Sequence, residues 1–312
     1  MISFRYHVVS IIAVFLALAL GIVVGTTALN GPITKDLRHQ VDSLKNDRNS
    51  LSDQVRQLQG QVGNDQKFAD LYTSQIVKGR LRDTNVLIIG LPGASGAVKD
   101  GLAKVVADAG GKVSGQIQLT NDYTDPKRAG QITKFATGGN IQPLGLTYPS
   151  TDQAGAIGGA LLAYVLLGRG EQSDLTQVLA GFSGMSMLNK EHGDGFTPST
   201  NVLVVSDGTL PANDARGQTE LALITQLQQQ GAHAVVAGDT QSATDGGVVA
   251  LVRGDGGDRS TVATVDNADT IVGRVSTILA LVDVRSPAPN TVVGHYGTAG
   301  GAKALYPNLA TK

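Results

Sequence analysis

Residues near position 190 could bind a soft metal ion. Met185, Met187 and His192 lie within eight residues of one another and offer two thioethers and an imidazole, a set that suits Cu(I). His295, in the glycine-rich segment 294–301, is a further candidate ligand. The competing interpretations are loop packing for the methionines and capping of the domain for His295. Because the chain has only 3 Met and no Cys, we expect no metal site and no bound cofactor.

The rest of the composition excludes several other chemistries. The histidines, at positions 7, 39, 192, 233 and 295, include no pair spaced for a helical metal site. Without cysteine, the chain lacks disulfides, thiol nucleophiles and iron–sulfur ligands. Its net charge of −1 gives no basic surface of the kind that neutralises phosphates, so we expect no nucleic-acid partner.

Segment 90–96, Gly-Leu-Pro-Gly-Ala-Ser-Gly, follows a strand-like run and precedes a helical one, where a phosphate loop would lie. Its spacing matches neither a dinucleotide-binding loop nor a Walker loop, and Pro92 removes an amide that a phosphate would need. Asp122 could mimic a ribose-binding acid, or simply begin a turn. We therefore predict a degenerate nucleotide fold that binds no nucleotide.

Segment 181–184, Gly-Phe-Ser-Gly, approaches the turn that presents a hydrolase serine. It lacks the glycine two residues after the serine, so we predict an ordinary loop. The linear sequence shows no serine or histidine converging with a carboxylate. We expect no catalytic residues and no enzymatic activity.

The elements that would position these residues are those of an α/β body. Short aliphatic runs alternate with amphipathic stretches, which favours strands connected by helices. The strand-like runs cover 85–90, 112–119, 201–206 and 234–237, and the expected helices lie near 98–109, 153–167, 220–230 and 270–284. The hexapeptides that begin at Asn85 and Asn201 are nearly the same. We therefore predict a Rossmann-like body of two possibly duplicated units, 84–200 and 201–312.

Residues 1–34 form a membrane anchor or a cleaved signal sequence. The apolar run 8–25 is longer than the 7–15 residues usual in a signal, which favours an uncleaved helix. Arg5 is the only Lys or Arg before it, so the positive-inside rule keeps the short end in the cytoplasm and the body outside. A single-pass envelope protein is the expected topology.

Residues 35–83 carry a heptad pattern typical of a coiled coil, preceded by Asn30-Gly31-Pro32 as a stop and restart. Apolar residues recur four and three apart, with leucine at each d position and Arg48 at one a position; the set is Leu37, Val41, Leu44, Arg48, Leu51, Val55, Leu58 and Val62. A helix folded back on its own domain is the competing interpretation. These a and d positions form a narrow apolar seam, which favours pairing with one partner helix. That helix would come either from a second copy in a parallel dimer or higher oligomer, or from another membrane protein.

The anchor adds a second indication of self-association. Small residues recur every fourth position at Ala13, Ala17, Gly21 and Gly25, which lets membrane helices approach closely. The competing interpretation is that alanine and glycine are simply common in membrane spans. Both features together favour parallel chains.

The whole chain resembles the actinobacterial MctB family. The resemblance rests on the opening Met-Ile-Ser-Phe-Arg-Tyr-His-Val-Val-Ser, the coil, the run Gly-Arg-Val-Ser-Thr-Ile-Leu-Ala-Leu at 273–281 and Val-Gly-His-Tyr-Gly-Thr at 293–298. It implies a copper transport protein of a diderm-like envelope, associated with the outer membrane. A related branch, SteB, implies instead a partner of a membrane protein that controls a peptidoglycan hydrolase during cell separation.

The residues and the resemblance together predict a non-enzymatic, membrane-anchored envelope protein of the copper transport family. Copper would be a transported species in efflux and homeostasis. The alternative function is a coiled-coil scaffold or regulator of cell-wall hydrolysis and cell separation.

Overall fold

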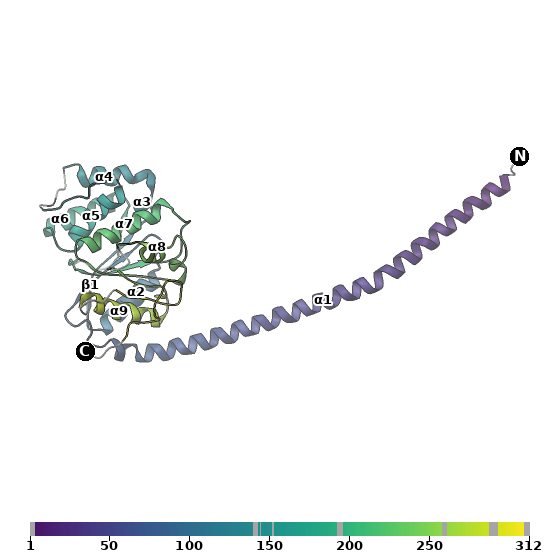
Figure 1. Cartoon of the computed structure of the whole chain (residues 1–312), viewed down its shortest axis with the longest axis horizontal. Coiled ribbons are helices and arrows are strands. Elements are labelled where there is room, and N and C mark those ends of the chain that lie inside the picture. The colour runs from purple at the N-terminus through teal and green to yellow at the C-terminus, as the bar shows by residue number, and fades with distance from the viewer. Residues whose placement is uncertain are drawn as a thin grey trace. The chain divides into compact units, whose positions relative to one another are not determined.

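The computed structural model describes residues 4–139, 143, 145–151, 153–191, 196–257, 261–286 and 293–308, with the side chains of 26–34 and Asp36 excluded. By its internal contacts the chain divides into two compact units, Met1–Asp65 and Gln66–Lys312. The larger unit contains the sheet and its covering helices (Figure 1).

A single long helix, α1 (Phe4–Val77), includes the predicted anchor and the predicted coil. The helix continues through residues 30–32, so the predicted stop and restart was wrong. Proline removes only one backbone donor, and the turns on either side keep their own hydrogen bonds. The helix also ends at Val77, six residues before the predicted end of the coil.

The body is built on one mostly parallel sheet. Its strands are β1 (Asn85–Gly90), β2 (Lys112–Leu119), β3 (Leu188–Lys190), β4 (Asn201–Ser206), β5 (His233–Gly238), β6 (Ala263–Val265) and β7 (His295–Tyr296). They lie in the order β3-β2-β1-β4-β5-β6-β7, and only β3 pairs antiparallel with its neighbour. The predicted mixed α/β class is confirmed.

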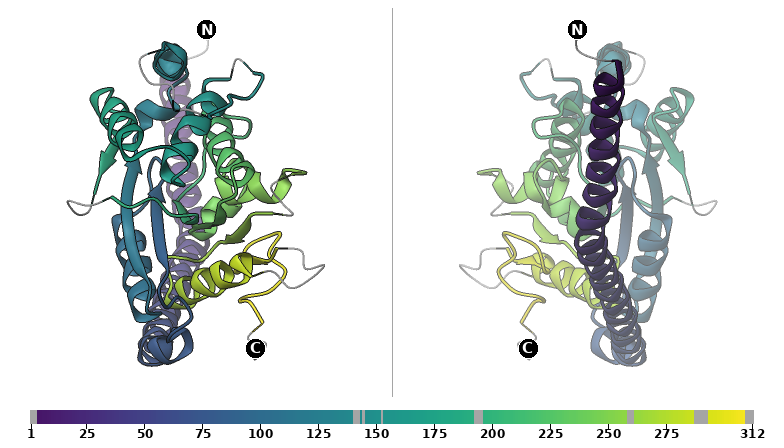
Figure 2. Two further views of the ribbon diagram at one scale, coloured as in Figure 1. Left: turned by 90° about the vertical axis from the view of Figure 1, so that its left-hand side faces the viewer. Right: turned by 90° about the vertical axis from the view of Figure 1, so that its right-hand side faces the viewer.

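Helices cover both faces of this sheet. They are α2 (Gly96–Asp108), α3 (Asn121–Thr124), α4 (Ala129–Thr137), α5 (Ala154–Leu166), α6 (Gln172–Gly184), α7 (Ala215–Gln229), α8 (Val248–Gly254) and α9 (Ile271–Arg285), with short 3-10 turns at Pro126–Arg128 and Thr240–Ala243. Figure 2 shows α9, in yellow, on the opposite side of the strands from α7, in green.

Side-chain alternation along each strand explains the two faces. In β1, Leu87 and Ile89 pack into the core beneath α4 to α7, while Val86 and Ile88 pack into the core beneath α2 and α9. Parallel strands that are buried on both faces have continuous aliphatic sequences, and for this reason they could be predicted from the sequence. The last turn of α1 and the turn after it contribute Val77 and Leu81 to the second core.

The two similar hexapeptides become neighbours at the centre of the sheet. β1 pairs in parallel with β4, from Leu87 opposite Val202 to Gly90 opposite Val205. Each of these strands then continues outward, β1 to β2 and β4 to β5. The duplication of two units stays a prediction. The topology does place the reversal of strand order between β1 and β4, where ligands bind in open α/β sheets.

Candidate functional site

The candidate soft ligands do not converge on one site. Met187 is fully buried beside the edge strand β3, and Met185 ends α6 against the same core. His295 is in β7 at the opposite edge of the sheet. With strands about 4.8 Å apart, these two edges are separated by the width of the whole sheet. His192 lies outside the described residues.

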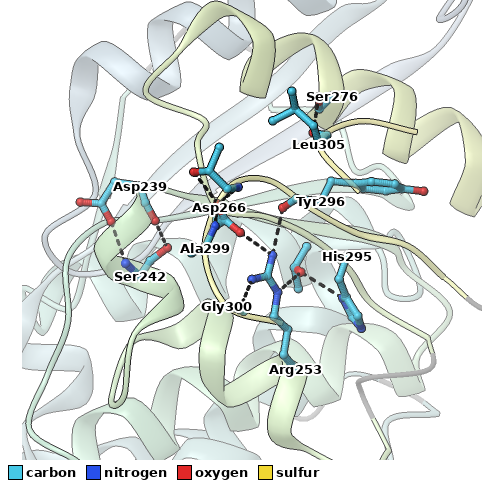
Figure 3. Close-up of polar contacts among 12 residues, drawn as sticks. Asp239, Ser242, Arg253, Asp266, Ser276, His295, Tyr296, Ala299, Gly300 and Leu305 are labelled. Atoms are coloured by element: carbon cyan, nitrogen blue, oxygen red, sulfur yellow. Dashed lines mark hydrogen bonds and ion pairs between the residues drawn. The ribbon is translucent and has the colours of Figure 1, made fainter. Parts of the chain in front are cut away.

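His295 belongs instead to a buried polar network around Arg253 (Figure 3). Its Nδ1 lies 3.0 Å from the hydroxyl of Thr264, which also accepts from Arg253 Nε at 2.9 Å. Arg253 pairs with Asp266 at 2.9 Å and donates to the carbonyls of Tyr296 and Gly300. The network fastens the segment after β7 to the sheet.

The glycine-rich loop after β1 is closed by a protein carboxylate. Ser95 N, at the start of α2, donates to Asp207 Oδ2 at 2.6 Å. Gly90 allows close packing, since a Cβ there would lie 2.3 Å from Gln118 Oε1. The helix N-terminus that could attract a phosphate thus already faces Asp207.

Asp122 forms an ion pair with a nearby arginine. Its carboxylate forms an ion pair with Arg128, whose guanidinium also donates to the carbonyl of Met185 at 2.8 Å. Asp122 also lies in the first turn of the short helix α3 after β2. These contacts agree with the turn interpretation of this residue.

Gly181-Phe-Ser-Gly184 is helical, so the loop predicted there was wrong. The segment forms the last turn of α6, where Phe182 is fully buried. Phe182 meets Phe135 edge to face at 5.3 Å between ring centroids. Glycine therefore serves close packing of α6 against α4.

Substituting Gly181 by alanine should destabilise the body by about 1–3 kcal/mol, the usual cost of overpacking. A Cβ at this position would lie 1.9 Å from Cζ of Phe135. Gly184→Ala is the matched control, because a Cβ there meets nothing within 4 Å. Denaturant unfolding of both variants measures the difference. Equal stability of the two variants would contradict the packing argument.

A small cavity of about 60 Å³ opens at the carboxyl end of β4, next to the point where the strand order reverses. Its charged lining comes from Asp207, directly after β4, and from Arg216 and Glu220 on α7. Neutral polar groups complete the wall, among them Asn121, Thr124 and Thr209.

The ionisable side chains that line this cavity differ in whether they have hydrogen-bond partners. Arg216 is fixed by Asp214, with Nε at 3.0 Å from Oδ1 and Nη2 at 2.8 Å from Oδ2. Within the described part of the chain, Glu220 has no hydrogen-bond partner although it is 4% exposed. Asp207 Oδ1 is likewise buried without a partner among the described residues.

Burial determines the electrostatics of the two acids. Desolvation raises the pKa of Glu220 to about 8, although the charge of Arg216 opposes the shift. Desolvation also raises the pKa of Asp207, against the hydrogen bond from Ser95 N. Poorly solvated carboxyls in a pocket are typical of binding and catalytic sites. At this pKa, Glu220 is largely protonated at neutral pH.

Sequence reasoning missed this constellation. Asp207 directly follows a buried strand. The carboxyl ends of parallel strands meet at one edge of the sheet, where ligands bind, so this position could have indicated a site residue. Glu220 and Arg216 gave no signal, since a charged pair four apart on a helix is usually a solvated face. Among the described residues, no group of three or more His, Cys, Asp or Glu is arranged to hold a metal ion.

Comparison with known proteins gives a match along the whole chain. A family model described as "Copper transport outer membrane protein, MctB" matches residues 1–307. The copper transporter MctB of Mycobacterium tuberculosis is 30% identical over 98% of this chain and 99% of its own length, and that of Mycobacterium bovis is equally similar. The copper transporter MctB of Mycobacterium leprae is also 30% identical, with the same coverage.

Proposed function

This chain belongs to the MctB copper transport outer membrane protein family, and from that premise we propose that it takes part in copper efflux and homeostasis in the cell envelope. The observation that carries the proposal is the length of the match, which includes both the apolar helix and the body. The family is one of transporters and not of enzymes. Copper is then the transported species, and we propose no catalytic step.

We further propose a single-pass topology with the body outside the cytoplasm. Phe4–Gly25 is the only stretch of the described chain that is both long and apolar enough to cross a membrane. Arg5 precedes the apolar run, and the positive-inside rule then favours a cytoplasmic N-terminus. Association of the body with the outer membrane would follow the family.

One helix per chain cannot enclose a pore, so transport would require assembly. In a bilayer, only a bundle of helices or a closed barrel satisfies its backbone around a channel. We propose that the protein acts through contacts made by α1 and the body, with copper moving through an assembly and not through one chain.

Copper accumulation in a deletion strain tests this function. Loss of the protein should raise cellular copper, and the full chain should restore it. A variant with Gly21 and Gly25 replaced by leucine tests the contribution of close helix approach in the membrane, since no described residue lies within 4 Å of a Cβ at either position. Unchanged copper in the deletion strain would refute the proposed function.

A second function is favoured by the exposed seam of α1. The apolar residues at its a and d positions are 51% to 68% exposed, a surface suited to a partner helix; they are Leu37, Val41, Leu44, Leu51, Val55, Leu58 and Val62. A scaffold that regulates cell-wall hydrolysis would use this surface. Leu44→Glu with Leu51→Glu should then impair cell separation, and normal separation in that variant would contradict the scaffold function.

We propose a second copy of this chain, parallel and in register, as the partner of the seam. Arg48 interrupts the seam at an a position and is preceded by Asp47 at g. In an in-register parallel pair, each Arg48 lies beside the partner's Asp47, because a and preceding g positions are neighbours across such an interface. The twofold arrangement forms this charge pair twice.

Leu44→Cys should therefore produce a disulfide-linked dimer on mild oxidation. The chain has no cysteine, so the introduced thiol would be the only one. Facing d residues of a parallel pair lie within the Cα separation that a disulfide allows. Asn46→Cys, on the outer f position, is the matched control and should cross-link much less. Equal cross-linking of both variants, or a link to a different protein, would contradict the proposed dimer.

A further inference from the structure

The cavity at the end of β4 is lined by a basic group and by acidic groups. Arg216 is held by two hydrogen bonds to Asp214. Only one edge of the planar guanidinium is used in that pairing, so Nη1 keeps both of its N–H donors for another group. No hydrogen bond to Nη1 is formed by the described residues. The Arg216 side chain is 41% exposed, and in this orientation its other edge can bind a carboxylate.

Glu220 supplies a carboxyl group one helical turn away. Positions 216 and 220 lie on the same side of α7, with side chains about 5–6 Å apart at Cβ. The two side chains nevertheless form no ion pair in the described structure, because Arg216 turns to Asp214. Glu220 is 4% exposed and lines the cavity without a hydrogen bond. A carboxyl that lines a cavity in this way can accept a hydrogen bond from a ligand.

The size of the cavity limits what could fill it. About 60 Å³ holds a few water molecules, since one water needs roughly 10–15 Å³ on this scale. A nucleotide is too large, and the loop amide of Ser95 is already bonded to Asp207. The unpartnered Asp207 Oδ1 adds one more acceptor at the same wall.

We propose that this cavity binds a small zwitterion of the α-amino acid class. The ligand's ammonium group would donate to Glu220 and the ligand's carboxylate would accept from Arg216. The site is at the switch point of the sheet, where open α/β sheets bind ligands. The inference is independent of copper transport, and either proposal can fail without the other.

Titration calorimetry of the full chain in detergent micelles tests the proposal. The probes are glycine, L-alanine and D-alanine, with acetate and methylammonium as ligands that carry only one of the two charges. We expect one equivalent of a zwitterion to bind at least tenfold more tightly than either half ligand. Equal affinity for methylammonium and glycine would overturn the proposal in favour of a simple cation site. Failure of all three amino acids to bind would overturn it entirely.

Variants of the two charged groups distinguish recognition from indirect effects. Glu220→Gln and Arg216→Gln should each weaken zwitterion binding at least tenfold, while Asp100→Asn, an exposed carboxylate outside the cavity, should leave binding unchanged. Circular dichroism confirms that each variant is folded. Zwitterion binding that survives both cavity substitutions would refute the assignment.

Proton release is a second readout of the same contact. The groups that influence Glu220 are Arg216 and Asp214 on its own side and Tyr123 from α3. The pKa of Glu220 is about 8 before a ligand binds, so this carboxyl is mostly protonated at pH 7. An ammonium group that pairs with the ionised carboxylate should therefore displace about one proton. Titration in two buffers of different ionisation enthalpy counts this proton. Zwitterion binding without proton release would contradict the role of Glu220.

Discussion

Replacing Glu220 by glutamine is expected to raise the free energy of unfolding of the body. This gain should be larger at pH 8.5 than at pH 4.5 by up to about 4–5 kcal/mol. The carboxyl lies almost fully inside the protein, and its pKa rises from 4.5 in an unfolded chain to about 8 in the folded one. Glutamine keeps the shape of the side chain but does not ionise.

The direction follows from proton binding in the two states. Below pH 4.5 Glu220 is protonated whether the chain is folded or unfolded, so it adds no pH dependence there. Between pH 4.5 and 8 the unfolded chain loses this proton while the folded protein keeps it, so the free energy of unfolding falls as pH rises. Above pH 8 both states are ionised and the loss is complete. The full shift sets an upper bound, since water entering the cavity would reduce it.

Denaturant unfolding at several pH values measures this effect. The chain has no tryptophan, so tyrosine circular dichroism in the near ultraviolet reports packing of the body. Asp100→Asn is the control for removal of a carboxylate, because its side chain is exposed. A difference between Glu220→Gln and the unmodified protein that does not change between pH 4.5 and 8.5 would contradict the buried, unpartnered state of Glu220.

Asp266→Asn should destabilise the protein by about 3–5 kcal/mol, the cost of leaving a buried charge without its partner. Asp266 is fully buried and pairs with Arg253 at 2.9 Å. Its other oxygen accepts from the backbone amides of Thr298 at 2.7 Å and Ala299 at 3.0 Å. An asparagine amide cannot neutralise Arg253, and it can present only one oxygen where the carboxylate presents two.

The same substitution at an exposed ion pair provides the control. Asp122 pairs with Arg128 where both side chains are partly exposed, so Asp122→Asn should cost at most about 1 kcal/mol. Hydrogen exchange adds a local measurement, because the amides of Thr298 and Ala299 should lose protection only in Asp266→Asn. A loss of stability no larger than that of Asp122→Asn would show that the network contributes little.

The long strands and helices of the body could be predicted because their signals are local. The central strands β1, β2, β4 and β5 have six to eight residues each and coincide with the strand-like runs of the sequence. Strands β3, β6 and β7 have only two or three residues, too few to establish a pattern of their own. They form because neighbouring strands offer unpaired backbone groups at the edges of the sheet.

Errors arose where packing or continuity overrode local preference. Segment 181–184 was predicted as a loop because it lacks the last glycine of a hydrolase turn, yet it completes α6, with Phe182 packed in the core. The helix also passes through residues 30–32, where proline and glycine predicted a break. In both cases the flanking helical turns decide the conformation of a weak segment.

The sequence by itself determined the apolar helix at the N-terminus, the α/β class of the body and, through its end motifs, the family. These depend on residue type and spacing along the chain. Only the tertiary structure decided which polar residues meet: it separated Met187 from His295 by the width of the sheet and placed Glu220 with Asp207 at one cavity. The reason is that a parallel sheet brings strand ends together through long crossovers, so residues distant in the chain meet at one edge.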